Sequence, residues 1–159
     1  MTDLLVLLQE FYRDKLATTL RHEANARVVA QYDVNNTYQY IINREEVQLS
    51  WVAAAIVDLG GQVPDHVDAA SVDGGKGDVR PIFESDAREA QAFVDRWRPR
   101  IEAMTNARHR GMLRVILGET LEQKRFFEQA LAGRTDLLGK RAEQLGPAIG
   151  EVLPTRWVE

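Results

Sequence analysis

The sequence predicts an all-α protein built as a four-helix bundle. Apolar residues recur at alternating spacings of three and four in four long segments, which is the pattern of buried helical stripes. One long polar connection, residues 62–84, separates these segments into two helical pairs. A length of 159 residues favours a single domain, 1–159. Within it we expect a core bundle over about 3–132 and a C-terminal extension over about 133–159.

The composition and charge of the chain exclude several kinds of functional site and partner. The chain has no cysteine, which excludes disulfides, thiolate metal sites and a cysteine nucleophile. Its net charge of −4 argues against nucleic acid as a partner. No stretch approaches the 18 apolar residues of a membrane span, and the apolar run near the N-terminus is too short for a signal peptide. We therefore expect a cytoplasmic protein that does not interact with membranes.

The first two helices are expected to form a hairpin. The first, about Asp3–Gln31, has a stripe composed of Leu5, Leu8, Tyr12, Leu16 and Thr19. The second, about Asn35–Leu59, has the most regular stripe in the chain, and Gly60-Gly61 ends it. That stripe consists of Tyr38, Ile41, Glu45, Gln48, Val52, Ala55 and Leu59.

The connection over residues 62–84 is long enough to cross the bundle. A helix of about 25 residues is roughly 38 Å long, and about 25 extended residues reach roughly 80 Å. The third helix would then start parallel to the second.

The third helix is expected to begin at Ser85 or Asp86, with Asp86-x-x-Glu89 as a capping box. Its stripe consists of Ala90, Phe93, Val94, Trp97, Ile101 and Met104. Pro99 should kink or break this helix.

The fourth helix is expected over about Ala107–Ala132, with a turn and cap at Thr105-Asn106. Its broad apolar face includes Met112, Leu113, Val115, Ile116, Phe126, Phe127 and Ala130. A short helix from about Thr135 to Leu145 and an irregular tail, residues 146–159, follow it.

Two polar residues interrupt the apolar stripe of the second helix. Glu45 and Gln48, three residues apart, should both face inward. A buried carboxylate needs a partner. If the first turn lies near residue 33, Glu45 is level with His22 and Glu23, and two facing carboxylates require a cation or a shared proton. Glu45 and Gln48 form either a polar site or a hydrogen-bonded core pair, and Glu23 could instead bond Arg21, Arg27 or Tyr38.

The pattern resembles the ferritin-like di-iron proteins, such as the rubrerythrin relatives. In that family two helices each supply a glutamate, and two each supply a Glu-x-x-His pair. The segment around Glu45 resembles the second-helix motif, with Gln48 in the place of the histidine. In the fourth helix Thr120 stands where the bridging glutamate is expected, and Gln123 replaces the histidine. The alternative frame gives Glu119-x-x-Glu122.

The resemblance implies a ferritin-like fold with a long crossover and a degenerate carboxylate site. The candidate metal ligands are Glu23, Glu45, Gln48, Glu119, Glu122 and Gln123. Iron and manganese sites of this class use imidazole as a strong ligand, and glutamine offers only an amide oxygen. The expected cofactor is accordingly none or a divalent metal, iron or manganese, and efficient redox turnover is not expected.

Two other functions are compatible with these residues. One is a di-metal oxidoreductase with altered ligands, in which His22 replaces a lost histidine; otherwise His22 is expected at the surface or beside the site. The other is a non-metal interaction module or homodimer whose interface includes Trp51, Ile56 and Leu121. His66 and the basic corner around His109 are expected to be solvated.

Overall fold

A computed structural model describes residues 3–65, 67, 78–134 and 136–138. It confirms an all-α bundle of four helices and, within those residues, contains no strand. The helices are α1 (Asp3–Ala26), α2 (Tyr32–Asp58), α3 (Arg80–Glu102) and α4 (Ala107–Leu131). None of these helices is long and apolar enough to cross a membrane.

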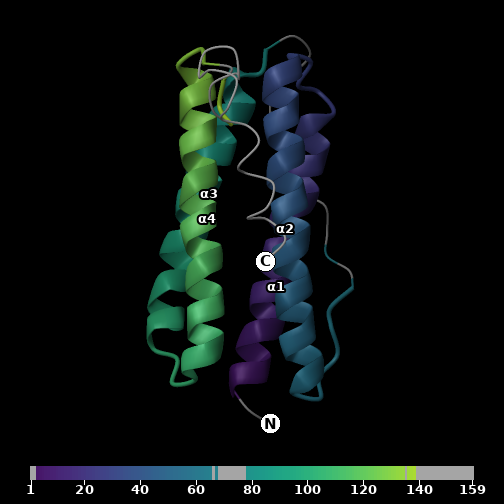
Figure 1. Ribbon diagram of the computed structural model, residues 1–159, viewed down its shortest axis with the longest axis vertical. Coiled ribbons are helices and arrows are strands. Elements are labelled where there is room, and N and C mark those ends of the chain that lie inside the picture. Colours follow the sequence, from purple (N-terminus) through teal and green to yellow (C-terminus); the bar gives the residue numbers. More distant parts are fainter. Residues whose placement is uncertain (1–2, 66, 68–77, 135, 139–159) are drawn as a thin grey trace, which may run out of the picture.

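The four helices form two antiparallel hairpins that face each other (Figure 1). Helix α1 packs on α2 and α3 packs on α4, while α1 lies beside α3 and α2 beside α4. Tyr38, near the start of α2, bonds Asp86 and stacks on Phe83, both near the start of α3. Helices α2 and α3 therefore begin at the same end of the bundle and run in the same direction.

Two apolar clusters fill the interior, one towards each end. One contains residues of all four helices, including Leu8, Phe11, Val52, Ile56, Phe93, Trp97 and Ile116. The other lies near the starts of α2 and α3 and includes Ile41, Ile82, Phe83 and Phe127. Because each cluster excludes water on its own side, polar side chains placed between them are cut off from solvent.

The first hairpin turn differs from the prediction for a local reason. Helix α1 ends at Ala26, five residues earlier than expected, and α2 begins at Tyr32. The Asn35 side chain donates to the carbonyls of Ala26 and Val29, 2.8 and 3.0 Å away, so it closes α1. The Gln31 side chain accepts from the Val34 amide at 2.7 Å and caps α2.

The third helix begins earlier than predicted. It starts at Arg80, with Pro81 in its first turn, where a fixed φ suits the helix and the missing N–H costs nothing. The predicted capping box is therefore wrong, because Asp86 lies inside the helix and is fully buried. The helix continues through Pro99 without a break and ends at Glu102.

The fourth helix is close to the prediction. Asn106 caps it by accepting from the His109 amide at 3.0 Å. Val115, expected in its apolar face, is half exposed instead. Beyond α4, residues 136–138 are described, and Leu137 is buried in the second cluster. The rest of the expected short helix and the tail from residue 139 lie outside the described residues.

Candidate functional site

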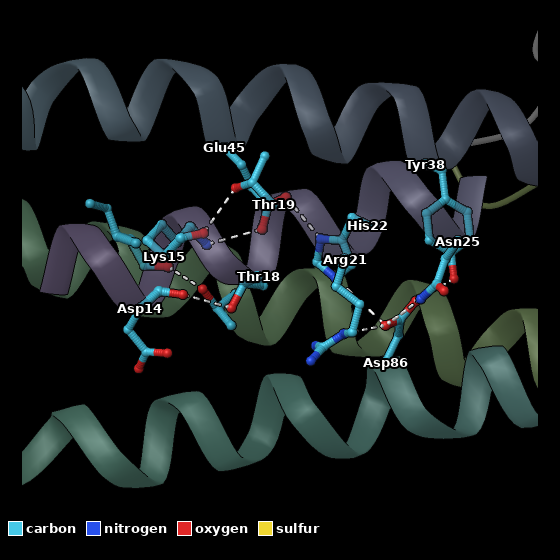
Figure 2. Close-up of polar contacts among 12 residues, drawn as sticks. Asp14, Lys15, Thr18, Thr19, Arg21, His22, Asn25, Tyr38, Glu45 and Asp86 are labelled. Atoms are coloured by element: carbon cyan, nitrogen blue, oxygen red, sulfur yellow. Dashed lines mark hydrogen bonds and ion pairs between the residues drawn. The ribbon is translucent and has the colours of Figure 1, made fainter. Parts of the chain in front are cut away.

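A network of buried charged and polar side chains lies between the two apolar clusters. Figure 2 shows the contacts of Lys15, His22, Glu45 and Asp86 within it. Helix α1 contributes Lys15, Thr19, His22 and Asn25; α2 contributes Tyr38, Glu45 and Gln48; α3 contributes Asp86; and α4 contributes Thr120 and Gln123. Each of these residues is nearly inaccessible to solvent. Charged residues are rarely buried unless they are paired, so their partners determine the chemistry of this layer.

Glu45 is held between an amine and an imidazole. Its Oε2 lies 3.3 Å from Lys15 Nζ and its Oε1 lies 2.8 Å from His22 Nδ1. The side chains of Lys15 and Glu45 are only 1% and 0% exposed. Burial alone would raise the pKa of Glu45, but His22 and Lys15 together hold that pKa below its usual value. Glu45 is therefore an anion, and His22 must donate to it from Nδ1, since an ionised carboxylate only accepts.

Asp86 is the second buried carboxylate. Tyr38 donates its hydroxyl to Oδ2 at 2.5 Å, and Asn25 Nδ2 lies 3.1 and 3.0 Å from the two oxygens. Arg21 Nε reaches Oδ1 at 3.3 Å from the edge of the core. Burial and the neighbouring Asp86 raise the pKa of Tyr38, so the phenol keeps its proton and remains a donor. Asp86 thus joins α3 to the α1–α2 hairpin.

The imidazole of His22 lies between the two carboxylates. Its Nε2 is 3.9 Å from Asp86 Oδ1, on the opposite side of the ring from Glu45. Its ring also packs against Phe127, with centroids 5.5 Å apart. Of the two places expected for His22, the surface is wrong, since the side chain is 2% exposed and lies beside Glu45.

A smaller polar group connects α2 to α4. Gln48 Nε2 donates to Glu119 Oε1 at 2.7 Å. Arg44 donates to both Glu119 oxygens at 3.1 and 2.8 Å. Gln48 bonds Glu119 rather than Gln123, and its Oε1 is buried with no hydrogen-bond partner among the described residues. Thr120 donates to the Ile116 carbonyl at 2.8 Å, which satisfies its hydroxyl within its own helix.

The structure brings together only part of the predicted ligand set. Gln48 is hydrogen-bonded to Glu119, and Glu45 on α2 and Gln123 on α4 are both buried. The other two residues do not join them. Glu23 lines a surface depression between α1 and α2, and Glu122 is exposed and paired with Arg125 at 2.9 Å.

The residues of the central layer do not fit a di-metal centre. Lys15 and His22 engage the two oxygens of Glu45, and Asn25, Tyr38 and Arg21 engage those of Asp86. Over the described part of the chain, no three His, Cys, Asp or Glu side chains are grouped so that they could hold a metal ion. A cation entering the layer would have to displace the Lys15 ammonium from Glu45.

Sequence reasoning missed Lys15 and Asp86. The stripe of α1 was predicted correctly at Leu5, Leu8 and Thr19. Its other positions, Tyr12, Leu16 and Glu23, each lie one residue past a buried one: Phe11, Lys15 and His22. Apolarity favoured Leu16 over its charged neighbour Lys15. The signal that could have identified Lys15 is the unbalanced charge of Glu45, which requires a cation from the facing helix.

Comparison with known proteins identifies no relative. No protein-family model, curated protein or solved structure matches the chain. Function must therefore be inferred from the contacts among the described residues.

Proposed function

We propose that the chain is a ferritin-like bundle in which a lysine ammonium, rather than a metal ion, neutralises the central carboxylate. Helices α2 and α3 are consecutive in the sequence and run in the same direction, which supports this fold. The connection between two such helices must cross the length of the bundle. Bundles with one such crossover include the ferritin-like folds. The inward Glu45 and Gln48, three residues apart on α2, support the same comparison.

The observation on which the proposal rests is the contact of Lys15 Nζ with Glu45 Oε2 at 3.3 Å inside the bundle. The ammonium occupies one oxygen of the central carboxylate, and the imidazole of His22 occupies the other. An ammonium ion has no accessible redox change, so this layer is suited to holding the helices together rather than to activating oxygen or peroxide. The function of the protein then lies in the bundle as a scaffold and in its outer surface.

A di-metal oxidoreductase with altered ligands is the weaker candidate. It needs Glu23 and Glu122 to turn inward beside Glu45. Glu23 lies in a surface depression, and Glu122 forms an ion pair with Arg125 one turn away on α4. No contact among these residues favours this alternative.

Metal analysis of the untagged protein tests the proposal. Iron, manganese and zinc are offered to the native chain, and bound metal per chain is measured after desalting. We expect far less than one equivalent of each metal and a thermal midpoint that neither chelator nor metal changes, because a ligand that does not bind the native state cannot stabilise it.

A matched pair of variants identifies the site if metal is found. Glu45→Ala alters the central carboxylate, and Glu122→Ala alters an exposed one. Near-stoichiometric metal that is lost in Glu45→Ala and retained in Glu122→Ala would overturn the proposal. It would make oxygen or peroxide turnover the next assay.

A further inference from the structure

An uncharged strip runs along the outer side of α2. It consists of seven residues at spacings of 4, 3, 4, 3, 4 and 3, all of them exposed: Asn36, Tyr40, Asn43, Val47, Ser50, Ala54 and Val57. We call these residues the α2 strip. Although charged residues make up 28% of the chain, the strip contains none.

The α2 strip is separate from the stripe that packs the core. The core stripe of α2 includes Ile41, Glu45, Gln48, Val52 and Ala55, all buried within the bundle. The strip residues follow the same repeat on a different side of the helix. In an ordinary surface helix that side would be charged or polar throughout. Four of the seven strip residues, Tyr40, Val47, Ala54 and Val57, are instead apolar or aromatic, and apolar residues at this spacing are the pattern of a helix that packs against another helix.

Three strip residues are exposed apolar side chains. Tyr40 is 45%, Val47 39% and Val57 60% exposed. Asn43 separates Tyr40 from Val47, and the small residues Ser50 and Ala54 separate Val47 from Val57. A row that mixes large and small side chains can interdigitate with a second helix of the same composition.

We infer that the α2 strip is the contact surface of a homodimer in which α2 of one copy packs antiparallel on α2 of a second copy. An antiparallel alignment centred between Val47 and Ser50 places Val47 of one copy opposite Ser50 of the other. It also places Tyr40 of one copy opposite Val57 of the other. Large side chains then face smaller ones. A parallel alignment would instead set Tyr40 on Tyr40 and Asn43 on Asn43.

The charges that flank the strip are compatible with the antiparallel alignment. Arg44 lies beside the strip on the side of α4, two turns from Trp51, whose ring it covers at 5.7 Å. Glu46 lies on the opposite side, and Ala53 occupies the corresponding place one heptad later. With the centre between Val47 and Ser50, Arg44 meets the Trp51 region of the second copy, and Glu46 meets its Ala53. No like charges face each other at these four positions.

The size of the strip sets the expected strength of the dimer. It is about 32 Å long at 1.5 Å per residue and about 10 Å wide, so it offers on the order of 300 Å² per copy. A standard stable interface buries roughly 800 Å² per partner. The dimer should therefore dissociate on dilution, and its fraction should increase with protein concentration.

Sedimentation of the full chain over a wide concentration range tests the interface. We expect a monomer–dimer equilibrium in the native protein and a weakening of at least tenfold in Val47→Glu, which places a charge at the centre of the strip. Val6→Glu is the matched control, because Val6 is a valine of α1 with 42% exposure that lies outside the strip. A native chain that stays monomeric at every concentration, or a dimer that Val47→Glu leaves intact, would overturn the inference.

Disulfide cross-linking tests the relative orientation of the two α2 helices. The chain has no native cysteine, so only the introduced cysteines can form disulfides. Asn43→Cys and Ala54→Cys proteins are mixed and oxidised. Antiparallel packing predicts a disulfide between the two different variants, and little between identical ones, since equivalent positions would lie about 16 Å apart along the axis. Disulfides between identical variants would overturn the antiparallel alignment.

Two further cysteine variants, Val47→Cys and Val6→Cys, distinguish a second copy from coverage within one chain. If another segment of the same chain covers the strip, Val47→Cys in a monomer would resist labelling by a thiol reagent while Val6→Cys is labelled. That result would overturn the homodimer. Slower labelling of Val47→Cys that appears only as concentration rises would support it.

Discussion

Lys15 and Glu45 form a buried ion pair in which each side chain depends on the other. Removing one partner leaves an uncompensated charge in the core, which typically costs about 3–5 kcal/mol. Replacing both partners by apolar groups is often neutral or stabilising. We therefore expect Lys15→Met to lower the free energy of unfolding by about 3–5 kcal/mol, and the double variant Lys15→Met/Glu45→Met to recover much of the loss.

Urea unfolding monitored by circular dichroism measures both effects. Lys124→Met is the matched control, because Lys124 pairs with Glu128 at 3.3 Å on the outside of α4. Such exposed pairs contribute about 0.3–0.5 kcal/mol. If Lys15→Met lowers the free energy of unfolding no more than Lys124→Met does, the buried pair does not stabilise the fold as we argue.

The lowered pKa of Glu45 also predicts how the stability of the fold depends on pH. Its folded pKa lies below the ordinary value of 4.5, so below that pH the unfolded chain takes up this proton more readily than the folded chain. The contribution of Glu45 is complete above about pH 4.5 and is lost as the pH falls through the folded pKa. The stability advantage of the native protein over Glu45→Gln should therefore shrink on acidification. Unfolding free energies of both proteins at several pH values between about 3 and 7 check this sign.

Individual residues show where sequence reasoning failed. Glu45 and Gln48 were correctly placed in the core because the α2 stripe is regular on both sides of them. The stripe of α1 was predicted correctly at Leu5, Leu8 and Thr19 but one position late elsewhere, at Leu16 rather than Lys15 and at Glu23 rather than His22. A helix repeat of 3.6 residues lets two neighbouring stripes fit equally well over a few turns, and hydrophobicity then selects the wrong one when a buried position is charged.

At the scale of elements, the caps determine where helices begin and end. Asn106 was predicted to cap α4, and its side chain accepts from the His109 amide. We expect Asn106→Ala to lower the free energy of unfolding by about 1 kcal/mol, since it leaves an amide at the helix start without a partner. Asn106→Asp keeps the acceptor and should cost less. Equal losses in both variants, measured by urea unfolding, would show that the cap bond contributes little.

The existence of all four helices was predictable, but their ends were less so. Asn35 was predicted as the start of α2, whereas its side chain bonds the carbonyls that end α1. Pro81 was placed in a loop, although it lies in the first turn of α3. Asparagine and proline act at either side of a helix boundary, so composition alone does not say which helix they belong to.

At the scale of the whole molecule, the two hairpins are joined through the polar layer as well as through apolar packing. Asp86 on α3 is bonded by Asn25 of α1 and Tyr38 of α2, and Glu119 on α4 is bonded by Arg44 and Gln48 of α2. Each hairpin is therefore tied to the other at two levels. This arrangement predicts that the bundle unfolds as a single unit rather than hairpin by hairpin.

Asp86→Asn tests that cooperativity. The change removes the charge that accepts from Tyr38, Asn25 and Arg21, and hydrogen bonds to a charged group typically contribute about 1.5–3 kcal/mol. Glu89→Gln is the control, because Glu89 meets the same Arg21 at 3.6 Å but is 42% exposed, and it should cost less than about 1 kcal/mol.

Hydrogen exchange of the backbone amides distinguishes cooperative from separate unfolding. If the polar layer couples the hairpins, Asp86→Asn lowers the protection of core amides in α1–α2 and in α3–α4 by the same factor, because both report one global opening. A loss confined to α3–α4 would mean that this hairpin opens alone and that the bonds of Asp86 do not link the two halves. Equal loss in both hairpins would show that the bundle unfolds as one cooperative unit.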